Sequence, residues 1–244
     1  MQTKIGIIGA MEVEVRLLIS LLKPLSNENS VKTKTSGGLN FVEGLLENVP
    51  VVIVRSGIGK VNAALCTQRL IFEFKVSHII NTGIAGAIAH GLNVLDFVVS
   101  SDALYHDMDA TGFGYKQTEI PQMECSDFIA DKNLISLVQN SFKNLTEQKE
   151  HKLVLGRIAS GDQFISSKSI KEKIAEICSP ACVEMEGAAI AHAAYLNNIP
   201  FIIIRCMSDM ADDSGENTYI FNEEIAATLS ARLVQNTVVQ INLK

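Results

Sequence analysis

A single α/β domain is predicted, with three layers in which helices cover both faces of a central mixed sheet. Short runs rich in Val and Ile, without polar alternation, are typical of strands that are covered on both faces. Such runs occupy residues 4–8, 51–55, 78–81, 97–100, 153–158 and 201–205. Segments with apolar residues at helical spacing lie between them, at residues 12–22, 61–74, 133–142, 169–177, 186–196 and 223–238. Strands that alternate with helices favour a largely parallel or mixed sheet.

The composition supports one folded unit. The chain has 244 residues, of which 47% are hydrophobic and 20% are charged, enough apolar material for a full core and too little charge for a disordered chain. Domains have roughly 100–200 residues, and no repeat or Pro/Ser-rich linker divides the sequence, so we expect residues 1–244 to form a single domain. Residues 105–125 carry few helical signals, which predicts a long excursion of the kind that is usually functional or lies at an interface.

Charge and cysteine usage narrow the class of protein. The 21 Lys and Arg residues against 27 Asp and Glu give a net charge of −6, which argues against a nucleic-acid partner and provides no attraction to anionic membranes. We expect no secretory signal peptide, because the apolar run at residues 5–10 is short and contains Gly6 and Gly9. No apolar run approaches the ~20 residues of a membrane helix. Five cysteines without a C-x-x-C pair are typical of reduced packing residues, so we expect a cytoplasmic protein.

Neither a metal nor an organic cofactor is predicted. His106, Asp107 and Asp109 lie close together in the sequence, but tight spacing on an irregular segment without a second cluster rarely suffices for a metal. The glycines of residues 6–9 do not have the G-x-G-x-x-G spacing of a dinucleotide site, and residues 56–60 do not form a P-loop.

Glycine-rich segments lie at the ends of two predicted strands: residues 56–60 follow one strand and open a helix, and residues 81–86 end another strand in small residues. In open α/β sheets, ligands bind beyond the carboxyl ends of the strands. Residues 56–60 alone are also consistent with a plain connection from strand to helix, but together the glycine-rich strand ends indicate one ligand crevice.

Charged residues gather at other element ends. Glu12 and Glu14 follow the first strand, Glu184 and Glu186 precede an Ala-rich helix, and Arg205, Ser208 and Asp209 end the last predicted strand. Carboxylates next to buried segments are costly unless they are paired or used in chemistry. Capping of the following helix is the alternative for the carboxylates, and the residue pattern alone leaves both interpretations open.

Seven short blocks occur in order along the chain. They are G-I-I-G-A-M-E-x-E-V (6–15), S-G-I-G-K-V-N-A-A (56–64), N-T-G-x-A-G (81–86), Y-H-D-x-D-x-T-x-F-G-Y (105–115), S-G-D-x-F-I (160–165), V-E-M-E (183–186) and R-x-x-S-D-x-A-D (205–212). Together they resemble the 5′-methylthioadenosine/S-adenosylhomocysteine nucleosidases of the nucleoside phosphorylase superfamily. The resemblance implies a nucleoside phosphorylase-like fold, no cofactor, and hydrolysis of the N-glycosidic bond between adenine and a 5′-thio-substituted ribose, as in methionine salvage.

Roles for individual residues follow from the resemblance. Asp209 would protonate N7 of adenine, which makes the base a better leaving group. Glu14 would accept a proton from the attacking water, with Arg205 close to that water. These residue types suit cleavage through an oxocarbenium-like state, which needs an acid at the leaving group and a carboxylate that activates water.

Contacts with a nucleoside substrate are implied in the same way. Glu186 would accept hydrogen bonds from the ribose hydroxyls, and Met185 would pack against the sugar. Phe164 would stack on adenine, with the Ile165 and Ala211 backbones near the base, and Ser208 would position Asp209. The alkylthio pocket would be lined by Met11, Ile58 and Phe113. The remaining lining would include Ile84 and Glu184. Because the family is homodimeric, residues 113–121 are expected to reach into the site of a neighbouring subunit.

One position and one segment depart from the family pattern. Ile84 stands where the bacterial pattern carries Ser, which removes a hydroxyl beside the ribose or the water. Residues 214–224 fit the pocket segment loosely, so either Tyr219 or Phe221 could close the pocket. Such changes could favour 5′-deoxyadenosine or aminodeoxyfutalosine over methylthioadenosine.

Two other functions remain as alternatives. A purine nucleoside or uridine phosphorylase on the same fold would need cations for phosphate, whereas Glu12 and Glu14 would repel it, and only Arg16 and Arg55 are nearby cations. A binding-only protein would be expected to lose Glu14 or Asp209, and both are present.

Overall fold

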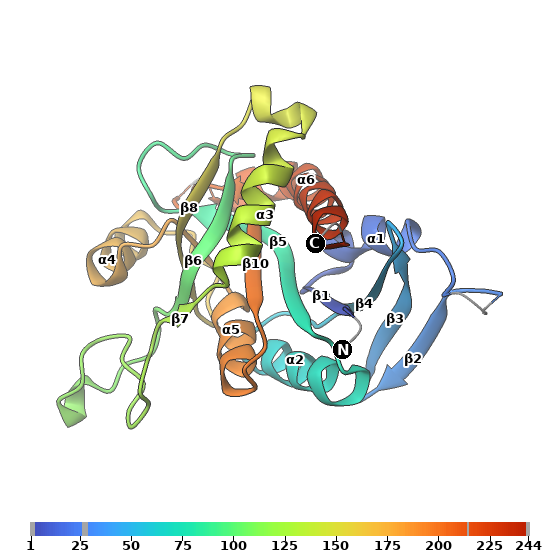
Figure 1. The fold of residues 1–244 in the computed structure, drawn as a ribbon. Helices are drawn as coiled ribbons and strands as arrows, with labels where there is room; N and C mark the ends of the chain where they lie inside the picture. The colour runs from blue at the N-terminus through green and yellow to red at the C-terminus, as the bar shows by residue number, and fades with distance from the viewer. Residues whose placement is uncertain (1–2, 26–28, 214, 243–244) are drawn as a thin grey trace.

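A mixed sheet runs through the computed structural model, which describes residues 3–25, 29–213 and 215–242 (Figure 1). Its ten strands among these residues are β1 (Ile5–Gly9), β2 (Lys32–Ser36), β3 (Leu39–Leu46), β4 (Val49–Arg55), β5 (His78–Ala87), β6 (Phe97–Tyr105), β7 (Phe128–Ile129), β8 (Leu153–Ser160), β9 (Cys182–Glu184) and β10 (Phe201–Asp209). Their order is β10–β6–β8–β9–β5–β1–β4–β3–β2, with β7 beside β6.

The central strands are apolar along their length because both of their faces are covered. Every residue of β1 and β10 is buried. β1 pairs in parallel with β4 and β5, and β5 pairs in parallel with β10. Continuous Val- and Ile-rich runs are the expected sequences for such strands. β6 runs antiparallel to β10, so the sheet is mixed, as predicted.

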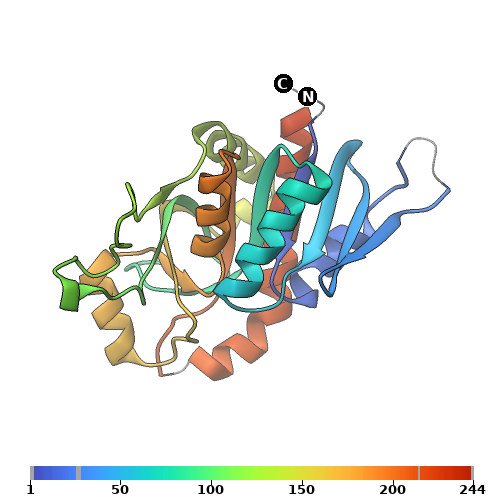
Figure 2. The same ribbon diagram turned by 90° about the horizontal axis from the view of Figure 1, so that it is seen from below.

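Helices lie on both faces of this sheet. They are α1 (Glu12–Ser20), α2 (Lys60–Phe74), α3 (Lys132–Lys143), α4 (Lys168–Cys178), α5 (Gly187–Leu196) and α6 (Gly215–Asn242). Figure 2 shows α2 and α5 across the near face, while α1 and α3 pack against the long α6 on the other. The predicted α/β/α fold is confirmed. None of the described helices combines the length and the apolar character that a membrane crossing requires.

Five strands close into a circuit. β5 pairs with β10, β10 with β6, β6 with β8, β8 with β9, and β9 returns to β5. Each of these five strands therefore pairs with two others of the circuit. In the β5–β10 pairing the register shifts between Met207 and Asp209, which leaves Ser208 as an extra residue. Such bulges re-aim side chains next to functional sites.

The hairpin of β2 and β3 is absent from the strands predicted above. β2 reads Lys-Thr-Lys-Thr-Ser, and its first four residues are exposed, because it is the last strand of the sheet. It has neither an apolar run nor apolar alternation, the two patterns that mark strands in a sequence. The predicted last helix also begins at Gly215 instead of residue 223.

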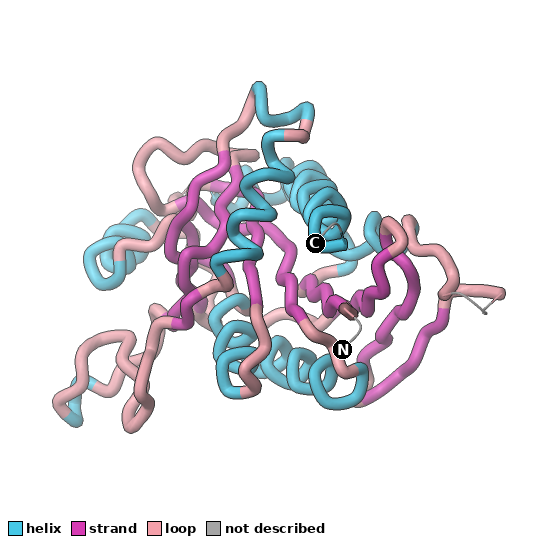
Figure 3. Tube along the Cα trace, viewed as in Figure 1, coloured by secondary structure: helices cyan, strands magenta, loops and turns pink. Residues whose placement is uncertain are grey.

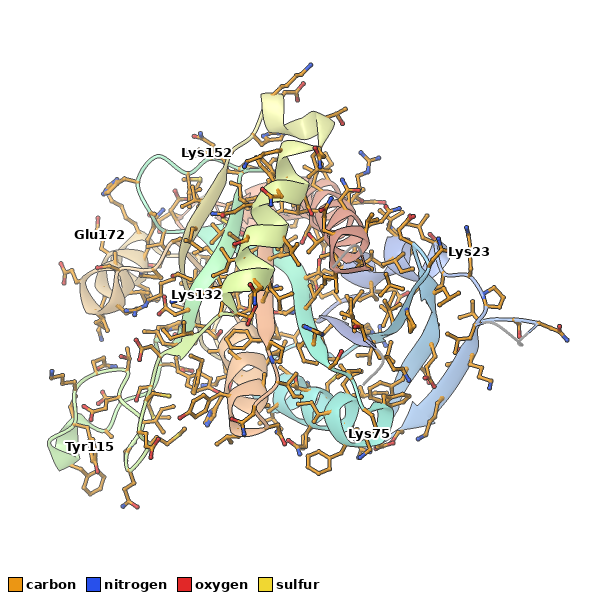
Figure 4. The ribbon with its side chains drawn as sticks, in the orientation of Figure 1. Lys23, Lys75, Tyr115, Lys132, Lys152 and Glu172 are labelled. Carbon is orange, nitrogen blue, oxygen red and sulfur yellow. The ribbon has the colours of Figure 1, made fainter. Side chains whose placement is uncertain are left out.

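Residues 106–127 form the predicted excursion. Figure 3 shows the segment mainly as loop that projects from the sheet, with a 3-10 turn at Thr111–Phe113. Phe113 is 88% exposed there. Figure 4 shows Tyr115 at the far end of this excursion, and it shows Lys23 and Glu172 pointing outward from the opposite ends of the molecule.

Candidate active site

A cavity of about 610 Å³ opens beside the ends of β1, β5, β9 and β10. Its lining comes from segments that are far apart in the sequence. The lining residues are Ala10, Met11, Glu14, Ile58, Ile84, Ala85, Gly86, Gln163, Phe164, Ile165, Val183, Glu184, Met185, Glu186, Ser208, Asp209, Tyr219 and Ile220. A mainly apolar cavity with a few convergent polar groups is the usual form of a small-molecule site.

Glu14 enters this cavity from the first turn of α1. Its carboxylate is buried and accepts hydrogen bonds from the backbone N–H groups of Ala10 (2.7 Å), Met11 (2.9 Å) and Ile84 (3.1 Å). Burial raises the pKa of Glu14, and the Arg205 guanidinium and these three donors oppose that rise. Glu14 thus caps its own helix and also lines the cavity, so the capping that the structure shows is compatible with a functional role.

The glycine at position 83 allows the approach of Glu14 to β5. A Cβ atom built on Gly83 would lie 2.5 Å from Oε1 of Glu14 and 3.0 Å from Nη1 of Arg205. Both distances are too short for a side chain at this position. The N-T-G-x-A-G block lies within β5, and its Gly83 leaves room for two charged groups.

Asp209 lies at the end of β10, directly after the bulge. Its Oδ1 accepts a hydrogen bond from the Ala211 N–H (2.8 Å), and its Oδ2 accepts one from the Ser208 hydroxyl (2.8 Å). Burial raises the pKa of Asp209, while these two donors favour the ionised form. A Cβ atom on Gly86 would lie 2.9 Å from Oδ1, so this carboxyl group also packs tightly against β5.

Arg205 lies beneath the carboxylates and outside the cavity lining. Its side chain is 2% exposed. Nη2 donates to Oδ1 of Asn81 (2.6 Å) and to Oε2 of Glu184. Burial lowers the pKa of Arg205, but the carboxylates of Glu184, Glu14 and Glu186 together outweigh this effect and raise it. Arg205 is therefore the shared counter-ion of three buried acids.

Glu184 and Glu186 have different partners although they are two residues apart. Glu184 Oε2 accepts from the N–H groups of Glu186 (3.0 Å) and Gly187 (2.7 Å), so it caps α5. Glu186 occupies the N-cap position of α5 without a side-chain capping bond, and its Oε1 instead accepts from the Gly59 N–H (2.8 Å). Burial and the neighbouring Glu184 carboxylate raise the pKa of Glu186 to about 8.

Aromatic and apolar side chains cover the opening of the cavity. Phe164 is 49% exposed, and its ring meets the Tyr219 ring edge-on at 5.5 Å between centroids. The Tyr219 hydroxyl donates to Oε1 of Glu223 (2.9 Å) and lies 3.4 Å from the Met11 sulfur. Tyr219 is therefore placed to close the pocket, while the Phe221 side chain lies outside the described side chains.

The sequence of the chain matches the phosphorylase superfamily over residues 4–239. A 5′-methylthioadenosine/S-adenosylhomocysteine nucleosidase from Staphylococcus aureus is 43% identical over 238 residues, covering 97% of this chain and 100% of the relative. The chain belongs to this nucleosidase family.

Solved structures of the nucleosidase family have the same fold. The enzyme from Colwellia psychrerythraea, solved with adenine, superimposes with a TM-score of 0.91 at 39% identity and covers 98% of this chain and 96% of its own. The enzyme from Neisseria meningitidis, solved with methylthio-immucillin-A, gives a TM-score of 0.90 at 36% identity, with 98% and 99% covered. This agreement confirms the nucleoside phosphorylase-like fold that the seven blocks imply.

Three residues that the nucleosidase resemblance places in the site lie outside the cavity lining. Arg205 lies below it, Phe113 is on the excursion, and Ala211 is buried with only its N–H directed at Asp209. Gln163 and Ile220 line the cavity although no sequence signal singles them out. Gln163 occupies the variable position of the S-G-D-x-F-I block, so its proximity to Phe164 is the one available clue. Among the described residues, no group of three or more His, Cys, Asp or Glu side chains is placed to hold a metal ion.

Proposed function

We propose that this member of the nucleosidase family hydrolyses the N-glycosidic bond of 5′-methylthioadenosine and S-adenosylhomocysteine, releasing adenine and the 5′-thioribose product. The observation that carries the proposal is one cavity lined by four buried acids, of which Glu184 caps α5 and Glu14, Glu186 and Asp209 remain for the chemistry. Glycosidic cleavage needs a proton donor at the leaving group and a carboxylate that activates water.

Asp209 acts as the acid in this proposal. Burial raises its pKa, which favours the protonated carboxyl group that a general acid must supply. Its proton passes to N7 of adenine, so the protonated base accepts the electron pair of the breaking bond and leaves as neutral adenine. Ser208 orients the carboxyl group through its 2.8 Å hydrogen bond.

Glu14 acts as the base that activates the attacking water. Burial raises its pKa, but Arg205 and three backbone donors stabilise its ionised form. It therefore accepts the water proton as the water attacks the anomeric carbon. Arg205 does not contact the substrate in this proposal, because its guanidinium lies outside the cavity lining. Its role is to stabilise the ionised form of Glu14.

Glu186 and the apolar lining bind the rest of the nucleoside. The free carboxylate oxygen of Glu186 accepts hydrogen bonds from the ribose hydroxyls, while its partner oxygen is held by Gly59. The pKa of Glu186 is raised to about 8 in the free site, but the positive charge of the oxocarbenium-like state favours the ionised form of Glu186, which in turn stabilises that charge. Phe164 stacks on adenine, Met185 packs against the sugar, and Met11 and Ile58 contact the 5′-substituent.

Adenine release tests the function directly. We expect free adenine and methylthioribose from 5′-methylthioadenosine in phosphate-free buffer, at a rate that added phosphate does not change, with chromatography as the measurement. Glu12 and Glu14 oppose a phosphate at this site. Turnover that requires phosphate and yields the sugar 1-phosphate would instead establish a phosphorylase.

A homodimer accompanies this function in our proposal. Val61, Leu65 and Phe72 on α2 are 69%, 59% and 57% exposed, and Leu196 at the end of α5 is 63% exposed. α2 packs beside α5 (Figure 2), so these side chains form an apolar face of the kind that mediates association. The excursion would then bring Phe113 to the pocket of the other copy.

Replacing Leu65 with Asp tests the dimer. The wild-type protein is expected to sediment at twice the 26.5 kDa of one chain. L65D is expected to sediment as a monomer and to lose activity, because it places a charge on the apolar face and withdraws Phe113. Ile170→Asp on α4, where the side chain is 42% exposed, is the control and should leave the dimer intact. A wild-type monomer with full activity would contradict the proposal.

A further inference from the structure

A second cavity of about 620 Å³ adjoins the first and shares Ala10, Met11 and Ile58 with it. The rest of its lining comes from α1, the β2–β3 hairpin and the end of β4. These residues are Glu12, Ile19, Thr33, Gly38, Leu39, Asn40, Val42, Arg55, Ser56 and Gly57. It offers hydroxyl and amide groups and, unlike the first cavity, a cationic side chain and no aromatic ring.

Two opposite charges stand in this second cavity. Nη1 of Arg55 lies 4.0 Å from Oε2 of Glu12, and the two side chains are 60% and 62% exposed. Charge-assisted N–H···O hydrogen bonds are usually about 2.7–2.9 Å long. The guanidinium donors and the carboxylate oxygens therefore keep capacity for a ligand.

We propose that the second cavity binds the zwitterionic amino-acid end of the 5′-substituent of S-adenosylhomocysteine, with Arg55 holding its carboxylate and Glu12 its ammonium group. The inference rests on the proposed function. A ligand that carries one negative and one positive charge is complementary to this pair. A phosphate or a dicarboxylate would be repelled by Glu12, and a diamine would be repelled by Arg55.

The shared wall explains how the tail reaches the charges. The proposed function places the 5′-sulfur against Met11 and Ile58, which line both cavities. In homocysteine, two methylene groups separate the sulfur from the carbon that carries the amino and carboxylate groups. A methylthio group ends at the shared wall, so only the longer substituent enters the second cavity. The pair Arg55 and Glu12 would therefore distinguish the two substrates.

Replacing Arg55 with Gln tests the proposal. The ratio kcat/KM is measured for three substrates: S-adenosylhomocysteine, 5′-methylthioadenosine and 5′-butylthioadenosine, whose tail is uncharged. Because the site is partly exposed, we expect a loss of about three- to tenfold for S-adenosylhomocysteine, mainly through KM. The two uncharged substrates should change by less than about twofold. Glu12→Gln should produce the same selective loss.

Lys132→Gln is the matched control, since it removes the same charge from the start of α3, away from the β2–β3 hairpin (Figure 4). It should leave all three substrates unchanged. Equal losses for charged and uncharged tails in R55Q and E12Q, or no loss for S-adenosylhomocysteine, would overturn the proposal. A wild-type protein that releases adenine from none of the three substrates would contradict the proposed function itself, which separates the two failures.

Discussion

Asp209→Asn is expected to lower the rate of adenine release by about 10²–10⁴-fold, the usual contribution of a general acid, while nucleoside binding is retained. Asparagine has nearly the same shape as aspartic acid, and its Oδ1 can still accept from the Ala211 N–H that Asp209 now engages. It has no acidic proton to give to N7. The loss should therefore appear in kcat and leave the dissociation constant of 5′-methylthioadenosine almost unchanged.

The measurement combines single-turnover adenine release with calorimetric binding to D209N. Asp127→Asn is the control, because Asp127 is a half-exposed partner of Arg157 at 3.5 Å and does not line the cavity. It should keep wild-type turnover. If D209N released adenine at the wild-type rate, Asp209 would not be the acid.

Arg205→Met is expected to lower the free energy of unfolding by about 3–5 kcal/mol, the usual cost of breaking a buried ion pair from one side. The 2% exposed guanidinium contacts Glu184, which is itself 3% exposed. Its removal also leaves Glu14 and Glu186 without their common counter-ion. Three buried carboxyl groups would then have to take up protons or unfold their surroundings.

Urea unfolding of the variant gives this quantity. Arg69→Met is the matched control, since the Arg69–Glu73 pair is 38% and 28% exposed, and partly exposed helix pairs contribute less than about 1 kcal/mol. An R205M protein as stable as R69M would show that the buried pair is not needed to hold the acids together.

The fold could be predicted wherever burial leaves a continuous mark on the sequence. β1 and β10 are covered on both faces, so their isoleucine-rich runs are easily predicted as strands. β2 lies at the edge of the sheet and consists of Lys, Thr and Ser, so nothing separates it from a loop. β9 has three residues, too few to show any period. Strands could therefore be predicted where they are long and buried, but not where they are exposed at the edge of the sheet or very short.

The candidate site could be predicted less fully, because its contacts are long-range. The seven blocks identify Glu14, Glu186 and Asp209, and all three line the cavity. Local sequence left capping and function open for each carboxylate, and it is the fold that separates Glu184, which caps α5, from Glu186, which does not. Their catalytic and binding roles stay predictions until the variants are measured.

The closed circuit of β5, β10, β6, β8 and β9 has a consequence for how this protein can diversify. In an open sheet, a one-residue shift in the register of a strand changes its pairing with its direct neighbours alone. In the closed circuit, such a shift of β10 would require matching register shifts in the four other strands. Asp209 and Glu184 end two strands of this circuit. Changes in the segments that connect the strands therefore leave the relative positions of these two residues unchanged. Residues around Ile58, Phe113 and Tyr219 lie outside those strands. The proposed function places the 5′-substituent beside these residues, so insertions or substitutions there would change the substituent that fits without moving Glu184 or Asp209.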